Sequence, residues 1–428
     1  MKRIGTTGVA LLVLLLLPSA ISAQKDTKQT REASKYIGLA MTKQTPDERA
    51  ELYRQAMEHL REGMAEDAEN AQVWKLAGTA LAALGDAQEA DRAFNRAVEL
   101  YPDYAEEIEA ERETAWVQSF NEGIQLMDQQ QYPEAIVALE AAQLMYDQRP
   151  EGLMNLGALY ANAGEQGKAE QALADAIAAT RGPVFDKLDA EQQAEWVRFR
   201  MMAVANIAQI QAQQGIASFE AEEFDSAAAR FQRAVETNPQ GRDYWFNYGQ
   251  ALWAMSSPLE DALADTTAAV SAADSARIRD QLSELYSKIQ VAAQKSREFD
   301  PNNEVLYLME ARTHRMAGSF DGGASASAGQ QEALRLLEAH GALTVTLDQI
   351  SVQPGAESGV TIRGMLKNMK ATEGSTVTVR FILLDLEGTV VGEQAITVTA
   401  PAAEQSVAFE GTAPATGEVA GWKYVVGG

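Results

Sequence analysis

Small and large apolar residues recur along the chain with the spacing of α-helices, and one short pattern of them keeps returning. A small residue, a large apolar residue and a second small residue follow at intervals of four and three positions, which places all three on one helix face. A period of 34 residues separates the first copy from the second and the third from the fourth, and predicts stacked helix pairs. The five copies are Ala56, Leu60 and Gly63; Ala90, Phe94 and Ala97; Ala135, Leu139 and Ala142; Ala169, Leu173 and Ala176; and Ala227, Phe231 and Ala234.

The stretch Val73–Pro102 shows what each position of the period does. Gly78 and Ala90 fall where two antiparallel helices touch, and larger side chains would hold the backbones apart. Trp74 and Phe94 pack around that contact. The stretch closely resembles a tetratricopeptide repeat, a helix–turn–helix unit of 34 residues. The resemblance implies an all-α superhelix that binds protein segments on its concave side.

Three segments carry signals for the start of a helix. Thr45 stands before Pro46, and Asp189 stands before a lengthened first helix of a repeat, so both are predicted N-caps. Ser257–Glu260 has the form of a capping box with a proline at the first helical position. It predicts a new long helix that runs to about residue 297.

The sequence predicts a multi-domain chain in which the repeats are followed by a small β-sandwich. Gly318–Gly329 consists mainly of small residues and predicts a mobile loop before a last, capping helix. The predicted segments are a signal peptide at 1–23, a loose tail at 24–32, the helical array at 33–317, the flexible loop and capping helix at 318–341, and the β-sandwich at 342–428.

After Gly341 the apolar period changes from helical to alternating, as in Val377, Val379, Phe381 and Leu383. Six or seven short strands over this region indicate a small antiparallel sandwich. The run RFILLDLEGTVVGE at residues 380–393 resembles the FxLYD family of bacterial Ig-like domains, with Leu384 in place of the family's Tyr. This resemblance implies an exported module without known catalysis. The simpler interpretation of these residues is that they form the core and turns of a sandwich of any family.

The N-terminus has the features of a secretory signal peptide. Lys2 and Arg3 form a basic head, Val9–Leu17 is an apolar run too short to span a bilayer, and small residues lead to a predicted cleavage after Ala23. The alternative is an uncleaved anchor. The chain has 0 Cys, so its exported form relies on packing rather than disulfides. These features predict a periplasmic or extracellular protein that spans no membrane once the signal is removed.

The chain carries a formal net charge of −25, and most of it belongs to the helical array. Residues 342–428 hold nine acids against five bases, a net charge of only −4. A strongly negative array disfavours nucleic acid and anionic lipid as partners. It favours solubility, and it also suits a partner with basic flanks.

The sequence offers no constellation for catalysis, cofactor binding or metal binding. His59, His314 and His340 lie far apart without a second ligand four positions later, and no HExxH motif is present. No nucleophile elbow, phosphate-binding loop or dinucleotide fingerprint follows a predicted strand. We therefore predict a protein that is not an enzyme and has no cofactor.

The resemblance to tetratricopeptide repeats implies which residues line the concave groove. An apolar groove of this kind suits an apolar or amphipathic peptide. Only Lys75 among these residues is basic, so a clamp for a C-terminal carboxylate is not predicted. Alternatively, long helices fold back and bury Phe246 and Trp253 in the core. The predicted groove residues are Lys75, Thr79, Phe120, Ile124, Met127, Met154, Asn162, Ile216, Phe219, Phe246, Gln250 and Trp253.

The favoured function is an exported scaffold that binds protein segments in this groove, in envelope assembly or secretion. A second hypothesis is a structural spacer that self-assembles through the strand edges of the sandwich. A third is an accessory subunit whose groove shapes the substrate site of an enzyme. The sequence leaves the partner and the oligomeric state open.

Overall fold

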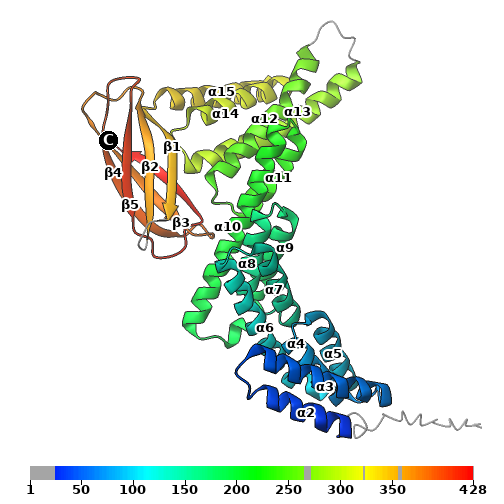
Figure 1. Cartoon of the computed structure of the whole chain (residues 1–428). Coiled ribbons are helices and arrows are strands. Elements are labelled where there is room, and N and C mark those ends of the chain that lie inside the picture. The colour runs from blue at the N-terminus through cyan, green and yellow to red at the C-terminus, as the bar shows by residue number, and fades with distance from the viewer. Residues whose placement is uncertain (1–24, 265–270, 322, 355–358, 428) are drawn as a thin grey trace, which may run out of the picture. The chain divides into compact units, whose positions relative to one another are not determined.

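The structure is a computed structural model that describes residues 25–264, 271–321, 323–354 and 359–427. Within these residues a series of α-helices precedes six β-strands (Figure 1). The helices are α2 (Lys28–Ala40), α3 (Pro46–Glu66), α4 (Ala71–Ala83), α5 (Ala87–Leu100), α6 (Ala105–Asp128), α7 (Tyr132–Met145), α8 (Pro150–Asn162), α9 (Gln166–Ala179), α10 (Ala190–Glu220), α11 (Phe224–Thr237), α12 (Arg242–Ala264), α13 (Ala272–Phe299), α14 (Glu304–Asp321) and α15 (Gly323–Gly341). The strands are β1 (Val345–Pro354), β2 (Val360–Asn368), β3 (Thr376–Leu384), β4 (Val390–Thr399), β5 (Ser406–Ala413) and β6 (Gly421–Gly427).

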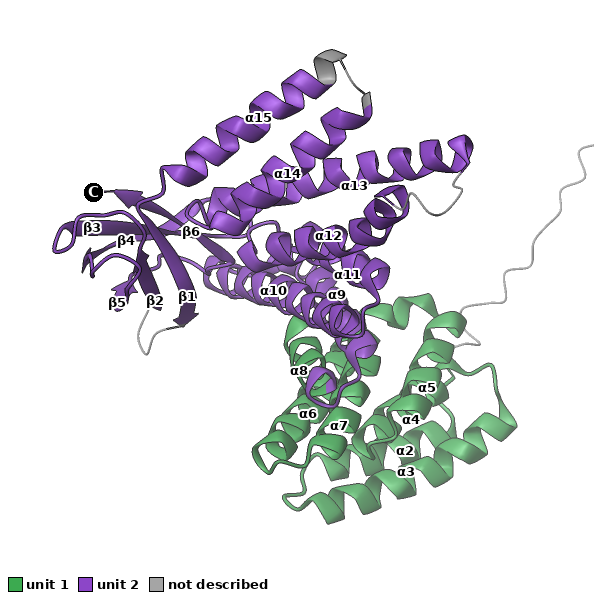
Figure 2. Ribbon diagram, turned by 90° about the horizontal axis from the view of Figure 1, so that it is seen from above, with its two compact units in different colours: residues 1–159 green, residues 160–428 purple. Residues whose placement is uncertain are grey.

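The chain divides into two compact units, Met1–Leu159 and Tyr160–Gly428 (Figure 2). In the first unit α2 packs with α3, α4 with α5, and α6 with α7. In the second unit α10 packs with α11, α12 with α13, and α14 with α15, and the strands follow. The predicted all-α array followed by an antiparallel β module is confirmed.

The repeating triplets form the contact between paired helices, as predicted. Every member of the five triplets is buried. In three repeats the large residue packs directly on a glycine 16 positions before it: a Cβ on Gly78 would lie 2.4 Å from the Phe94 ring, and one on Gly215 would lie 2.7 Å from the Phe231 ring. The third pair is Gly123 with Leu139. These glycines let the two backbones approach, and the large residue fills the contact.

Two of the three predicted N-caps are confirmed. The Thr45 side chain accepts a hydrogen bond from the Glu48 N–H, and the Asp189 side chain accepts from two N–H groups at the start of the 31-residue α10. The predicted helix start at Ser257 is wrong, because α12 continues through Pro258 to Ala264. Leu259 and Leu263 still pack on the core beyond the proline, and their burial offsets the missing N–H of proline.

Two predicted loops are helical. The first helix begins at Lys28 inside the predicted tail, with the Thr27 side chain as its N-cap. The predicted mobile loop at Gly318–Gly329 is also wrong, since α14 and α15 occupy its described residues. A Cβ on Gly329 would lie 2.4 Å from the backbone oxygen of His314. The small residues therefore serve the close approach of two helices.

The C-terminal module consists of two antiparallel three-stranded sheets, in the orders β1-β2-β5 and β4-β3-β6. Side chains from both sheets form one core, so the sheets pack face to face. The alternating residues Val377, Val379, Phe381 and Leu383 of β3 are all buried, as predicted. Gly388 has a φ of 82° and makes the turn before β4.

None of the described helices is long and apolar enough to cross a bilayer. The predicted signal peptide at residues 1–23 lies outside the described residues.

Candidate partner-binding groove

The second unit carries two cavities along one face of α12. Phe246, Asn247, Gln250, Trp253 and Ala254 stand at positions i, i+1, i+4, i+7 and i+8, so they share one helix face, and they line two cavities. The first helices of the neighbouring repeats, α10 and α14, complete the walls. The groove is therefore made by the first helix of each of three repeats.

The cavity beside the C-terminal half of α12 is apolar and has a volume of about 490 Å³. Val305 and Leu308 on α14 are each 45% exposed there, a large exposure for aliphatic side chains. The Arg312 guanidinium lies 4.7 Å from the centroid of the Trp253 ring and forms an ion pair with Glu260. Its charge is thus occupied, and the cavity offers mainly apolar contact. The lining residues are Phe219, Gln250, Trp253, Ala254, Val305, Leu308, Met309 and Arg312.

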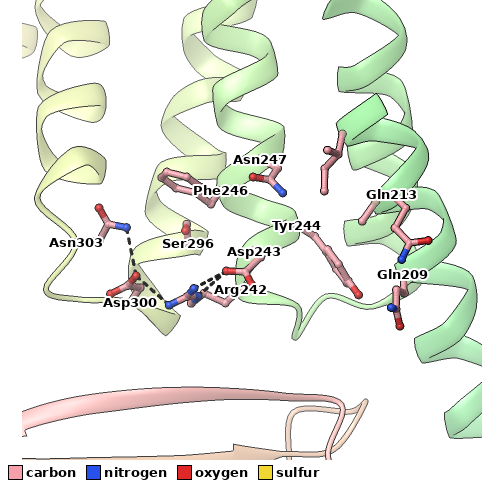
Figure 3. Close-up of a pocket in the computed structure, with 12 residues that line it drawn as sticks. Gln209, Gln213, Arg242, Asp243, Tyr244, Phe246, Asn247, Ser296, Asp300 and Asn303 are labelled. Carbon is pink, nitrogen blue, oxygen red and sulfur yellow. Dashed lines mark hydrogen bonds and ion pairs between the residues drawn. The ribbon is translucent and has the colours of Figure 1, made fainter. Parts of the chain in front are cut away.

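The cavity beside the N-terminal half of α12 has a volume of about 450 Å³ (Figure 3). More polar side chains line it than line the apolar cavity, so we call it the polar cavity. Arg242 lies between Asp243 and Asp300, and the Asn303 amide donates to Asp300 at 3.2 Å. Ser296 is 1% exposed, and its hydroxyl has no hydrogen-bond partner among the described residues. The hydroxyl oxygen is itself covered by protein, so it is a buried unpaired group behind the cavity wall.

Five of the predicted groove residues come together on this surface. Ile216 and Phe246 line the polar cavity, and Phe219, Gln250 and Trp253 line the apolar one. Phe246 and Trp253 are half-buried: each packs against the core and also lines a cavity. Their complete burial, the alternative considered above, does not occur.

Lys75 and Thr79 lie on α4 but are engaged with α6. Lys75 forms ion pairs with Glu107 and Glu111, and the Thr79 hydroxyl donates to Glu111. Burial raises the pKa of the Glu111 carboxyl above its ordinary value, although Thr79 and Lys75 oppose that shift. These residues therefore hold two repeats together, and the prediction that they face a ligand is not supported.

The remaining predicted residues lie on α6 and α8. Phe120 stacks on Trp116 with ring centroids 4.7 Å apart and is half-buried. Ile124, Met127 and Met154 are half-buried, and Asn162 is exposed. Their part in ligand binding stays a prediction.

Sequence reasoning missed the α14 wall. The last repeat is degenerate, so Val305, Leu308 and Arg312 do not stand at recognisable repeat offsets. A weaker signal was present, because their intervals of three and four positions place them on one helical face. The capacity of this face to complete the groove depends on tertiary packing.

One group of side chains has the composition of a metal site. Ligand atoms of Glu310, His314 and Glu332 all lie within 4.8 Å of one another. Arg297 donates to Glu310 at 2.8 Å, and Arg335 donates to Glu332, so both carboxylates are already neutralised. The group therefore joins α13, α14 and α15 electrostatically, and no excess negative charge is left for a cation. The sequence search missed it because Glu310 precedes His314 by four positions instead of following it.

Burial lowers the pKa of His314 below its ordinary value, so the imidazole is neutral in the folded chain near pH 7. The unfolded chain then binds more protons, and stability is lost as the pH falls below about 6.5. We expect His314→Gln to remove this loss, which is small because solvent reaches the ring. Thermal unfolding at pH 7.5 and 5.5 measures the difference; an unchanged pH dependence in the variant would contradict it.

Comparisons with known proteins agree with the repeat pattern. A family model described as tetratricopeptide repeat matches residues 120–183 and 213–281. These two segments match the tetratricopeptide repeat, in agreement with the helix pairs that the structure describes there. No curated protein matches the chain.

Several solved structures are similar at low identity. MamA protein is 15% identical over 52% of this chain and 92% of its own, with a TM-score of 0.25. The tetratricopeptide domain of P58(IPK) is 12% identical over 72% of this chain and 98% of its own, with a TM-score of 0.22. The C-terminal part of a repeat protein from Cytophaga hutchinsonii is 13% identical over 72% of this chain and 95% of its own, with a TM-score of 0.21.

Proposed function

We propose that the protein is an exported, non-enzymatic scaffold that binds an apolar or amphipathic segment of a partner protein in the groove of α10, α12 and α14. The observation that carries this proposal is the apolar cavity of about 490 Å³, where Val305 and Leu308 are exposed beside Trp253. Burial of these side chains by a ligand supplies binding free energy. The net charge of −25 favours a partner whose flanks are basic.

The features of the N-terminus support export, and with it a role in cell-envelope assembly or secretion. The C-terminal module fits an FxLYD-like, Ig-like assignment in three respects. Phe381 and Leu383 are buried in its core, Asp385 accepts a hydrogen bond from the Thr389 N–H at 2.7 Å, and Gly388 makes the following turn. Fractionation of the producing cells tests the location, and a cytosolic protein would contradict export.

Leu308→Asp is expected to weaken peptide binding by on the order of 10- to 100-fold, because it places a charge in the apolar cavity. The probe is a set of 16-residue peptides selected on the full chain from a displayed random library, and fluorescence anisotropy measures their affinities. Leu334→Asp is the matched control. Leu334 is 54% exposed on α15, the second helix of its pair, and is not among the groove residues.

Selected peptides should carry an apolar residue that is essential for binding, and the control variant should bind them as well as the parent chain. A library that yields no peptide whose affinity depends on Leu308 would contradict the proposed function. Equal losses in the Leu308 and Leu334 variants would also contradict it, since they would reflect general damage. Circular dichroism confirms that both variants remain folded.

A further inference from the structure

The polar end of the groove leads into a third cavity, which the β module helps to form. This cavity has a volume of about 910 Å³ and shares Arg242, Asp243 and Tyr244 with the polar cavity. One wall is the N-terminal half of α10, and the other consists of β1, the start of β2 and the segment 415–422. We call it the α10–sandwich cleft. It adjoins the groove at the polar cavity.

The sandwich wall is fixed to the loops that precede α12 and α14. The Asn238 amide donates to the carbonyl of Ala420 at 2.9 Å, and the Asn302 amide donates to the carbonyl of Val345 at 2.8 Å. The Arg242 guanidinium lies 4.8 Å from the centroid of the Trp422 ring. The same loops thus hold the sandwich and begin the groove helices, so the cleft is a built part of the fold.

Both walls of the cleft offer apolar side chains. Val197 and Met201 on α10 are half-buried, and on the sandwich Val352, Val419 and Trp422 are partly covered. The groove and the cleft together therefore have an apolar cavity at one end, an amide-rich middle, and at the other end a cleft in which apolar side chains lie among polar ones.

The amide-rich middle selects the form of the partner. Gln209, Gln213 and Asn247 carry side-chain amides there. An α-helix satisfies its backbone groups internally and leaves little for these side chains to bind. An extended segment presents free N–H and C=O groups, which side-chain amides pair with well.

We propose that the partner segment lies extended along α12 and continues into the α10–sandwich cleft, so that the β module is the second half of the binding site. This inference rests on the proposed function. Residues 242–254 span roughly 18 Å at about 1.5 Å per residue, which an extended segment covers with about five or six residues. The partner is a segment with two apolar anchors separated by at least about five residues.

Two bulky substitutions test the cleft, one on each wall. Ala194 on α10 and Gln353 on β1 are exposed and line the cleft, so Ala194→Trp and Gln353→Trp narrow it without disturbing the core. Ala276→Trp, at an exposed position of α13, is the matched control. The probes are the 16-residue peptides selected on the full chain. A second set is shortened to the peptide residues whose contribution to binding depends on Leu308.

We expect each cleft variant to weaken the full-length peptides at least about 10-fold and to leave the shortened ones unchanged. Unchanged binding of the full-length peptides to Gln353→Trp would overturn the role of the sandwich. If Leu308→Asp still weakens both peptide lengths in that case, the proposed groove function stands and only this inference fails. If Leu308→Asp weakens neither length, the proposed function itself fails.

Discussion

Phe231→Ala is expected to lower the free energy of unfolding of the second unit by about 3–5 kcal/mol. Phe231 is 1% exposed and lies in the core shared by α10, α11, α12 and α13. Its ring fills the space left by Gly215, so removal of the ring leaves a cavity that the helix backbones cannot close. Urea denaturation followed by circular dichroism measures the loss.

Val291→Ala is the control for this prediction, because Val291 is 50% exposed on α13 and should cost less than about 0.5 kcal/mol. Gly215→Val alone should cost about 1–3 kcal/mol, since its Cβ would meet the Phe231 ring. The double variant should lose less free energy of unfolding than the two single variants lose together, because the valine side chain occupies part of the cavity left by the phenylalanine ring. Strict additivity would mean that the two residues do not form the contact described.

The repeat contacts could be predicted from the sequence because they depend on local spacing. Gly215 and Phe231 stand 16 positions apart, as Gly78 and Phe94 do, and a helix–turn–helix of fixed length brings them together. Pro258 shows the opposite case. Its local signal for a helix start is genuine, yet tertiary burial of later residues keeps α12 continuous. Small residues around Gly329 were equally ambiguous, because they suit both a loop and a tight helix contact.

The candidate site could be predicted only in part, for the same reason. Repeat offsets pointed to Phe246 and Trp253 as groove residues, and both line cavities, since their direction follows from helix geometry. They could not show that Lys75 is paired with Glu107 across two repeats. Nor could they place Trp422 beside the start of α12, because that contact joins residues far apart in sequence. Long-range packing decides which inward-facing residues stay free.

The junction between helices and sandwich provides the second large expected effect. The Tyr424 hydroxyl donates to the buried Asp300 carboxylate and accepts from the Asn302 N–H at 3.3 Å. Arg242 forms an ion pair with the same carboxylate at 3.4 Å. Asp300→Ala leaves the buried Tyr424 hydroxyl without an acceptor and removes one partner of the half-buried Arg242 guanidinium, and should cost about 3 kcal/mol. Protection of the β6 amides from hydrogen exchange should fall with it.

Asp300→Asn keeps the shape of the side chain at this junction and removes its ability to ionise. Burial raises the pKa of the Asp300 carboxyl, although Tyr424 and Arg242 oppose that shift. The folded state therefore binds the proton more tightly, and the stability this group supplies is present below its ordinary pKa of about 3.9 and is lost as the pH rises through the raised value. The Asp300→Asn variant should therefore not show this loss of stability with rising pH.

Unfolding by urea at a series of pH values from 3.5 upward tests that expectation. Asp243→Asn is its control, because the Asp243 side chain is 66% exposed and pairs with the same arginine. The control should retain the fall in stability that the parent chain shows. If the β6 amides of Asp300→Ala stay as protected from hydrogen exchange as the β2 amides, apolar contacts alone hold the sandwich to the helices. Those contacts join Phe299 and Trp245 to Ile382 and Leu384. The wall of the α10–sandwich cleft would then survive the loss of its buried polar junction.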